Sequence, residues 1–142
     1  MATGGGLWLV KSDPSVYGFP ELCRDKATLW EGVRNPTAQL HLRAMAKGDG
    51  VLIYHTGAQK AIVGRATVIE GPVPDPTADD PRIVAVRLAA GKALQQPVTL
   101  AQIRAQGTLE ELPLIRMGRL SVMPIPPAAW QTLLALGQGR RA

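Results

Sequence analysis

Residues with the chemistry to bind a nucleotide are grouped between positions 30 and 36 of the chain. Trp30 supplies a flat aromatic face and Arg34 a positive charge. Asn35-Pro36 is typical of a helix start, since asparagine caps helices and proline suits the first helical position. The free N–H groups of a helix start attract anions, and an indole stacks on planar groups. The segment predicts a nucleotide-binding corner, or else a structural one in which Trp30 fills the core and Asn35 only caps the helix.

A second set of polar residues follows an apolar run near the beginning of the chain. Residues 7–10, Leu-Trp-Leu-Val, predict a strand, and Pro14 forces the chain out of it into a loop. Lys11 and Ser12 lie at that strand end, where a lysine offers a charge and a serine offers a hydrogen-bond donor and acceptor. These two residues either line a pocket or solvate the turn.

Catalytic and metal-binding patterns are scarce. His41 and His55 are the only histidines, and the sequence lacks the nucleophile-elbow, phosphate-loop and zinc-protease motifs. A Ser12/His55 pair is the one arrangement that would suit a nucleotide-processing enzyme, whereas His55 alone would cap a strand end or form a pocket wall. Cys23 is the single cysteine, so we expect no disulfide and no zinc site, and we place Cys23 in the core. We therefore expect no metal, no cofactor, and binding rather than catalysis.

The composition favours an anionic partner. Lys and Arg number 16 against 11 acidic residues, giving a net charge of +5 and a sequence pI of about 9.9. The charges are scattered, apart from the pair Arg140-Arg141, so no basic tail is predicted. No segment approaches the roughly 18 apolar residues that span a membrane, and the start lacks the basic region of a signal peptide. We expect a cytoplasmic protein without a membrane partner.

The elements that would position these residues are short. Apolar periodicity and capping signals predict helices over residues 17–26, 36–47, 99–106 and 126–136, the last with Trp130 in the core. Strands are predicted over residues 51–55, buried on both faces, and over 61–70, 82–88 and 120–123. Residues 56–60 would join the first two of these as a hairpin, with Gly64 marking a bulge or a close backbone approach.

Residues 71–81 contain four prolines and three aspartates. Aspartates in a group are metal ligands in some loops, but prolines that fix an extended backbone favour a surface loop here. With the strand at residues 7–10, the short strands and helices predict a single α+β domain built on a small, strongly curved or closed sheet.

Several motifs taken together resemble the EVE domain, a member of the PUA-like superfamily and a relative of the YTH domain. They are WLVKSDP at 8–14, WEGVRN at 30–35, GD at 48–49 with YH at 54–55, IVG at 62–64, PDPT at 74–77 and RMGRLSV at 116–122. They run in the family's order from about residue 7 to residue 136. The resemblance therefore implies one EVE domain over residues 1–142.

The resemblance implies a PUA-like fold, a small β-barrel surrounded by short helices, and a non-catalytic module that binds nucleic acid. Its ligand would be a flipped, modified cytosine or adenine in DNA or RNA. The implied base-binding pocket comprises Lys11, Ser12, Trp30, Val33, Arg34, Asn35, Tyr54 and His55, with Arg116, Arg119 and Ser121 contacting phosphate or base. The alternatives are a nucleotide-processing enzyme and a small-molecule or protein-interaction module that uses the same pocket.

The sequence departs from the family at two helix positions. Pro36 stands where an aromatic residue commonly follows the Arg-Asn pair, and His41 replaces a common asparagine. Because only six aromatic residues are present in all, we do not expect a complete three-sided aromatic cage.

Overall fold

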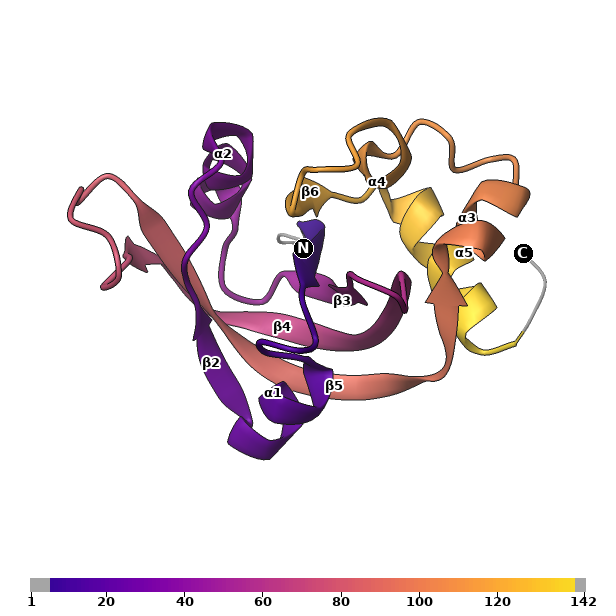
Figure 1. Cartoon of the computed structure of the whole chain (residues 1–142), viewed down its shortest axis with the longest axis horizontal. Coiled ribbons are helices and arrows are strands. Elements are labelled where there is room, and N and C mark those ends of the chain that lie inside the picture. Colours follow the sequence, from indigo (N-terminus) through magenta and orange to yellow (C-terminus); the bar gives the residue numbers. More distant parts are fainter. Residues whose placement is uncertain (1–5, 140–142) are drawn as a thin grey trace.

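The computed structural model describes residues 6–139 and shows a mixed α+β fold (Figure 1). Its strands are β1 (Leu7–Ser12), β2 (Ala27–Trp30), β3 (Gly50–His55), β4 (Ala61–Pro74), β5 (Val84–Thr99) and β6 (Val122–Pro124). Its helices are α1 (Phe19–Asp25), α2 (Pro36–Ala44), α3 (Leu100–Ala105), α4 (Pro113–Arg116) and α5 (Pro127–Gly137). The prediction of an α+β fold with short helices is confirmed. Arg140 and Arg141 lie outside the described residues.

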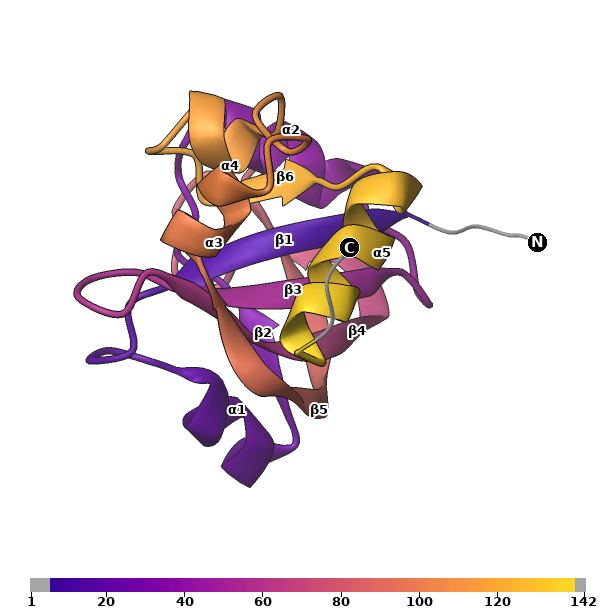
Figure 2. The same cartoon turned by 90° about the vertical axis from the view of Figure 1, so that its right-hand side faces the viewer.

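The strands form one six-stranded sheet in the order β2-β5-β4-β3-β1-β6. The pair β1/β3 is parallel, and the other neighbouring strands are antiparallel. The long strands β4 and β5 bend strongly along their length (Figures 1 and 2). A closed barrel is not confirmed, because β2 and β6 are the two edges of the sheet and no pairing joins them within residues 6–139. The sheet is therefore curved but open.

Register shifts in β4 and β5 account for this curvature. The β4/β5 ladder is shifted on both sides of Gly64, and again between Val68 and Val73. Each irregularity adds a local bend and twist to the strand that carries it. The predicted bulge at Gly64 is confirmed. A Cβ atom at this position would overlap the ring of Phe19, so the backbone of β4 also passes unusually close to α1.

The strands β4 and β5 are longer than predicted. Residues 71–74 were assigned to a loop, but β4 continues to Pro74, since prolines are tolerated where a ladder is irregular. β5 continues from Leu88 to Thr99 through residues with weak strand preference, because pairing with β4 supplies the hydrogen bonds. Tertiary pairing therefore overrides local propensity at both places.

The core lies between the sheet and the helices. β3 is buried from Val51 to His55, as predicted, and Trp130 of α5 is buried at 5% exposure. The prediction that Cys23 belongs to the core is wrong, because the short helix α1 buries only Phe19 and Leu22 and leaves Cys23 exposed. Within residues 6–139, every helix is too short or too polar to cross a membrane.

Candidate nucleic-acid interface

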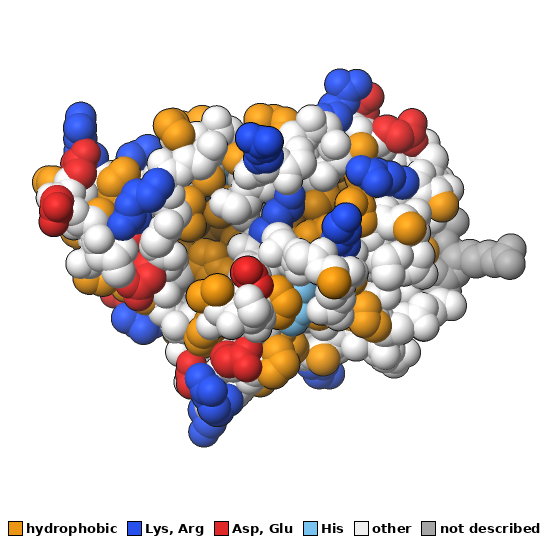
Figure 3. Space-filling view, in the orientation of Figure 1, with side chains coloured by type: hydrophobic (Ala, Val, Ile, Leu, Met, Phe, Trp, Pro, Cys, Tyr) orange, Lys and Arg blue, Asp and Glu red, His pale blue; other side chains and the backbone are white. Residues whose placement is uncertain are grey.

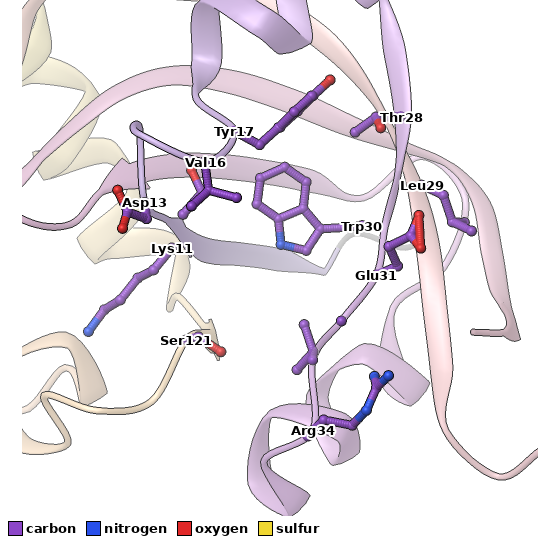
Figure 4. A pocket seen from close by; sticks show the side chains of 13 residues that line it. Lys11, Asp13, Val16, Tyr17, Thr28, Leu29, Trp30, Glu31, Arg34 and Ser121 are labelled. Atoms are coloured by element: carbon purple, nitrogen blue, oxygen red, sulfur yellow. The ribbon is translucent and has the colours of Figure 1, made fainter. Parts of the chain in front are cut away.

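A cavity of about 520 Å³ opens between β1, β2 and the segment that precedes β6 (Figure 4). Residues far apart in the chain therefore form its walls. Its lining includes six of the predicted site residues, which are Lys11, Ser12, Trp30, Val33, Arg34 and Ser121. It also includes residues that were not predicted, namely Asp13, Val16, Tyr17, Thr28, Leu29, Glu31 and Gly32.

An aromatic wall forms one side of the cavity. Trp30 ends β2, where it pairs with Val86 of β5, and its side chain is only 9% exposed. The Tyr17 ring meets the Trp30 indole edge-on, with the ring centroids 6.4 Å apart and the planes at 79°. Tyr17 is itself held by a 2.8 Å hydrogen bond that its hydroxyl donates to Asp25. The two rings therefore offer one aromatic surface to a planar ligand and do not form a three-sided cage.

A buried carboxylate fixes the wall that follows Trp30. Asp75, whose side chain is 0% exposed, accepts hydrogen bonds from the Gly32 N–H at 2.8 Å and from Arg34 Nη1 at 3.2 Å. It also accepts from the N–H and the hydroxyl of Thr77 at 2.7 and 2.6 Å. Gly32 has a φ of 83°, a conformation that side chains rarely adopt, so this bend requires glycine. Asp75 was predicted to lie in a surface loop, and its burial corrects that prediction.

The hydrogen bonds of Asp75 make the fold sensitive to acid. Burial disfavours the charged carboxylate, but the bonds from Thr77, Gly32 and Arg34 outweigh it and hold the pKa of Asp75 below its usual value. A depressed pKa in the folded state stabilises the protein above the unfolded-state pKa, and this stabilisation is lost as the pH falls through the folded value.

We therefore expect the free energy of unfolding, measured by urea titration, to fall below about pH 4. The Asp75→Asn variant should be less stable at neutral pH and should depend less on pH in the acid range. An identical acid dependence in the two proteins would contradict this assignment.

The start of α2 is built as predicted. The Asn35 side chain accepts the Ala38 N–H at 3.0 Å and caps the helix, and Pro36 occupies the first helical position. Asn35 is therefore used as a cap and is not among the residues that line the cavity. Arg34 remains 46% exposed while its Nη2 donates to Thr77 at 2.9 Å, so its charge is held in place at the cavity's edge.

Lys11 and Ser121 join the cavity to the turn before β6. Lys11 Nζ donates to the Gly118 carbonyl at 2.9 Å, and the Lys11 N–H donates to the Ser121 carbonyl at 2.9 Å. Partial burial lowers the pKa of the Lys11 ammonium. Ser12 Oγ is buried and has no hydrogen-bond partner within residues 6–139. A polar atom of this kind recovers its lost hydrogen bond when a ligand atom reaches it.

Tyr54 and His55 do not line the cavity. The Tyr54 ring lies beneath Lys11, whose Nζ is 5.6 Å from the ring centroid. His55 Nε2 accepts the Phe19 N–H at 2.9 Å, which places the proton on Nδ1 to donate to Gln59 Oε1 at 2.8 Å. Because both ring nitrogens are engaged, His55 secures the start of α1 and is not available as a base for Ser12.

Arg116 and Arg119 lie outside the cavity lining, on and just after α4. Arg116 forms an exposed ion pair with Glu111 at 3.3 Å. Arg119 is exposed and has no hydrogen bond or ion pair within residues 6–139. Lys and Arg side chains surround part of the hollow on this face of the molecule (Figure 3). The contact of Arg116 and Arg119 with phosphate stays a prediction.

Some residues that shape the site could not be found from local sequence. Asp75 is 43 positions from the Gly32 N–H that it binds. Buried Gln39 binds the Val33 carbonyl at 2.7 Å and both the N–H and the carbonyl of Val84, again across the chain. Tyr17 could have been proposed as a site residue from the sequence, because it is an aromatic residue just after the turn that follows Lys11 and Ser12.

The chain has clear relatives among known proteins. It is 39% identical to Rpa0253 from Rhodopseudomonas palustris, with a TM-score of 0.88 over 93% of this chain and 92% of that one. It is 31% identical to Atu2648 from Agrobacterium tumefaciens, with a TM-score of 0.89 over 93% and 92% of the two chains. The human THYN1 protein, solved in complex with 5-methylcytosine containing DNA, is 24% identical. It has a TM-score of 0.84 over 94% and 98% of the two chains, which shows a shared fold.

The sequence pattern of the EVE domain matches residues 6–136. This range includes every strand of the sheet and every residue that lines the cavity. The chain belongs to the EVE domain family.

Proposed function

We propose that the protein binds DNA that carries a modified cytosine and holds this base, turned out of its stack, in the cavity beside Trp30. The observation that carries the proposal is the combination of an indole wall with two held cations, Lys11 and Arg34, around one cavity of about 520 Å³. The complex of the human THYN1 protein with 5-methylcytosine containing DNA supports the choice of ligand.

Stacking on the aromatic wall is not enough by itself to give useful binding affinity. Turning a base out of a duplex costs a few kcal/mol, and stacking on an aromatic side chain contributes about 1–3 kcal/mol. One stack on Trp30 therefore only offsets the cost of turning the base. Useful affinity must come from hydrogen bonds inside the cavity and from phosphate contacts outside it.

Polar groups in the cavity suit the edge of a cytosine. The exocyclic amine of cytosine is a donor that carboxylates accept. Glu31 is an exposed carboxylate in the cavity lining, and Ser12 Oγ is a buried hydroxyl without a partner. A base that leaves such groups unpaired binds less well, which gives the cavity a basis for selectivity.

Fluorescence anisotropy with matched oligonucleotides tests the proposal. The probes are single- and double-stranded DNA and RNA of one sequence, each with and without one 5-methylcytosine, at two salt concentrations. We expect tighter, salt-sensitive binding to methylated DNA. Equal and weak binding to all probes would overturn the proposal and leave only a basic surface.

Arg119 should act through phosphate rather than through the base. We expect Arg119→Ala to weaken binding to methylated and unmethylated DNA by the same factor. The slope of log affinity against log salt should become shallower by about 0.9, the value for one lost phosphate contact. Lys92→Ala is the matched control, since Lys92 is also exposed but lies outside the cavity lining. A loss of methyl selectivity in Arg119→Ala would show instead that Arg119 reads the base.

A further inference from the structure

Val16 is the most exposed large hydrophobic side chain within residues 6–139, at 80%. A single exposed apolar residue is ordinary on a protein surface and by itself indicates nothing. Val16, however, belongs to the lining of the cavity and lies beside Trp30, between Asp13 and Tyr17 (Figure 4). An aliphatic side chain therefore projects into solvent at the edge of the proposed base-binding cavity.

The turn that carries Val16 is fixed by hydrogen bonds. The Asp13 carboxylate accepts the N–H and the hydroxyl of Ser15 at 2.9 and 2.6 Å, and the Asp13 carbonyl accepts the N–H groups of Val16 and Tyr17, both at 2.9 Å. The hydrogen bond from the Ser15 hydroxyl also lowers the pKa of Asp13, which shows that it favours the charged carboxylate.

Both ends of the turn are also anchored to the sheet. Before the turn, the Ser12 carbonyl accepts the Thr56 N–H at 2.9 Å. After it, the Phe19 N–H donates to buried His55, and the Tyr17 ring lies against Trp30. Val16 is therefore presented on a rigid support.

A base that leaves a duplex opens a gap in the stack. Other DNA-binding proteins insert apolar side chains between base steps, and a side chain inserted in this way would fill such a gap. In this protein the exposed side chain of Val16 lies at the edge of the cavity that we propose holds the base. We propose that Val16 inserts into the stack of duplex DNA at the place of the base that the cavity holds. The inference rests on the proposed function and adds a duplex, rather than a single strand, as the form of DNA that the protein opens.

The proposal predicts a defect that depends on pairing. We expect Val16→Ser to weaken binding to a methylated duplex about tenfold while changing binding to the methylated single strand less than about twofold. A mismatch opposite the methylcytosine lowers the cost of turning the base out, so it should reduce the defect. Val16→Leu, which keeps an apolar wedge, should bind the duplex like the parent protein.

A fluorescent base analogue provides a second measurement. With 2-aminopurine next to the methylcytosine, the saturated parent complex should be brighter than the saturated Val16→Ser complex, because the analogue brightens when it loses its stacking. Leu40→Ser is the matched control, since Leu40 is 61% exposed and lies outside the cavity lining. It should leave both measurements unchanged.

The outcomes separate this inference from the proposed function. Equal weakening of duplex and single-strand binding in Val16→Ser, or no weakening at all, would overturn the wedge while leaving a base-binding cavity in place. If the parent protein shows no preference for methylated DNA in any form, the proposed function fails first.

Discussion

Replacing Trp30 with alanine is expected to abolish the preference for methylated cytosine and to weaken binding to methylated DNA by about 5- to 150-fold. This range corresponds to the roughly 1–3 kcal/mol that stacking of one base on an aromatic side chain provides. Trp30→Phe keeps an aromatic face and should retain most of the selectivity. Anisotropy titrations with methylated and unmethylated duplexes measure both quantities.

Stability must be separated from binding in this experiment. Trp30 is largely buried, and truncating a buried aromatic residue to alanine costs about 3–5 kcal/mol of stability. Trp130→Phe is the matched control, because Trp130 is buried in the core on α5 and does not line the cavity. It should lower the melting temperature and leave selectivity intact. Selectivity in a folded Trp30→Ala protein equal to that of the parent would overturn the assignment of Trp30 to the base.

The second large effect is expected at Gly64, where alanine should destabilise the fold by about 1–3 kcal/mol, the usual range for overpacking. The new Cβ would overlap the ring of Phe19, which is buried at the first position of α1. Relief requires the ring, and with it the start of α1, to move away from the sheet. Urea unfolding measures the loss of stability.

Two further variants test the cause of this effect. Gly71→Ala is the matched control, since its Cβ would meet nothing within 4 Å, and we expect a change of less than about 1 kcal/mol. Phe19→Leu combined with Gly64→Ala should cost less than the sum of the two single changes, because the smaller side chain relieves the overlap. Strict additivity would show that the Phe19 ring is not what Gly64 accommodates.

Local sequence predicts the helices α1, α2, α3 and α5 and the strands β1, β3, β4, β5 and β6 approximately, but it misses α4 and β2. Asn35-Pro36 starts α2 and the Thr99/Gln102 capping box starts α3, because both signals act within one turn of the chain. The strand β3 was predictable from its continuous apolar run. The ends of β4 and β5 were not predictable, because each strand forms its hydrogen bonds with the other strand and not with residues nearby in the sequence.

The cavity was predictable in part for the same reason. Trp30, Lys11 and Arg34 carry suitable chemistry on their own, so their residue types mark them. His55 carries suitable chemistry too, yet the fold turns it toward Phe19 and Gln59, and only the tertiary structure reveals this. Asp75 could not be recognised because aspartate among prolines is typical of exposed loops, whereas here the β2–α2 connection buries it.

The open sheet has a consequence for how the width of the cavity can vary within this family. The cavity has the edge strand β2 on one side, and the end of β1 with the segment that enters the other edge strand, β6, on the other. The width of that gap depends on how far the sheet bends, and the bend is set by the register shifts of β4 near Gly64 and beyond Val68. Inserting or deleting one residue at such a shift would widen or narrow the gap without altering any lining side chain. The size of the cavity in EVE domains is therefore open to change through backbone insertions and deletions far from it, and two members with identical lining residues need not have cavities of the same width.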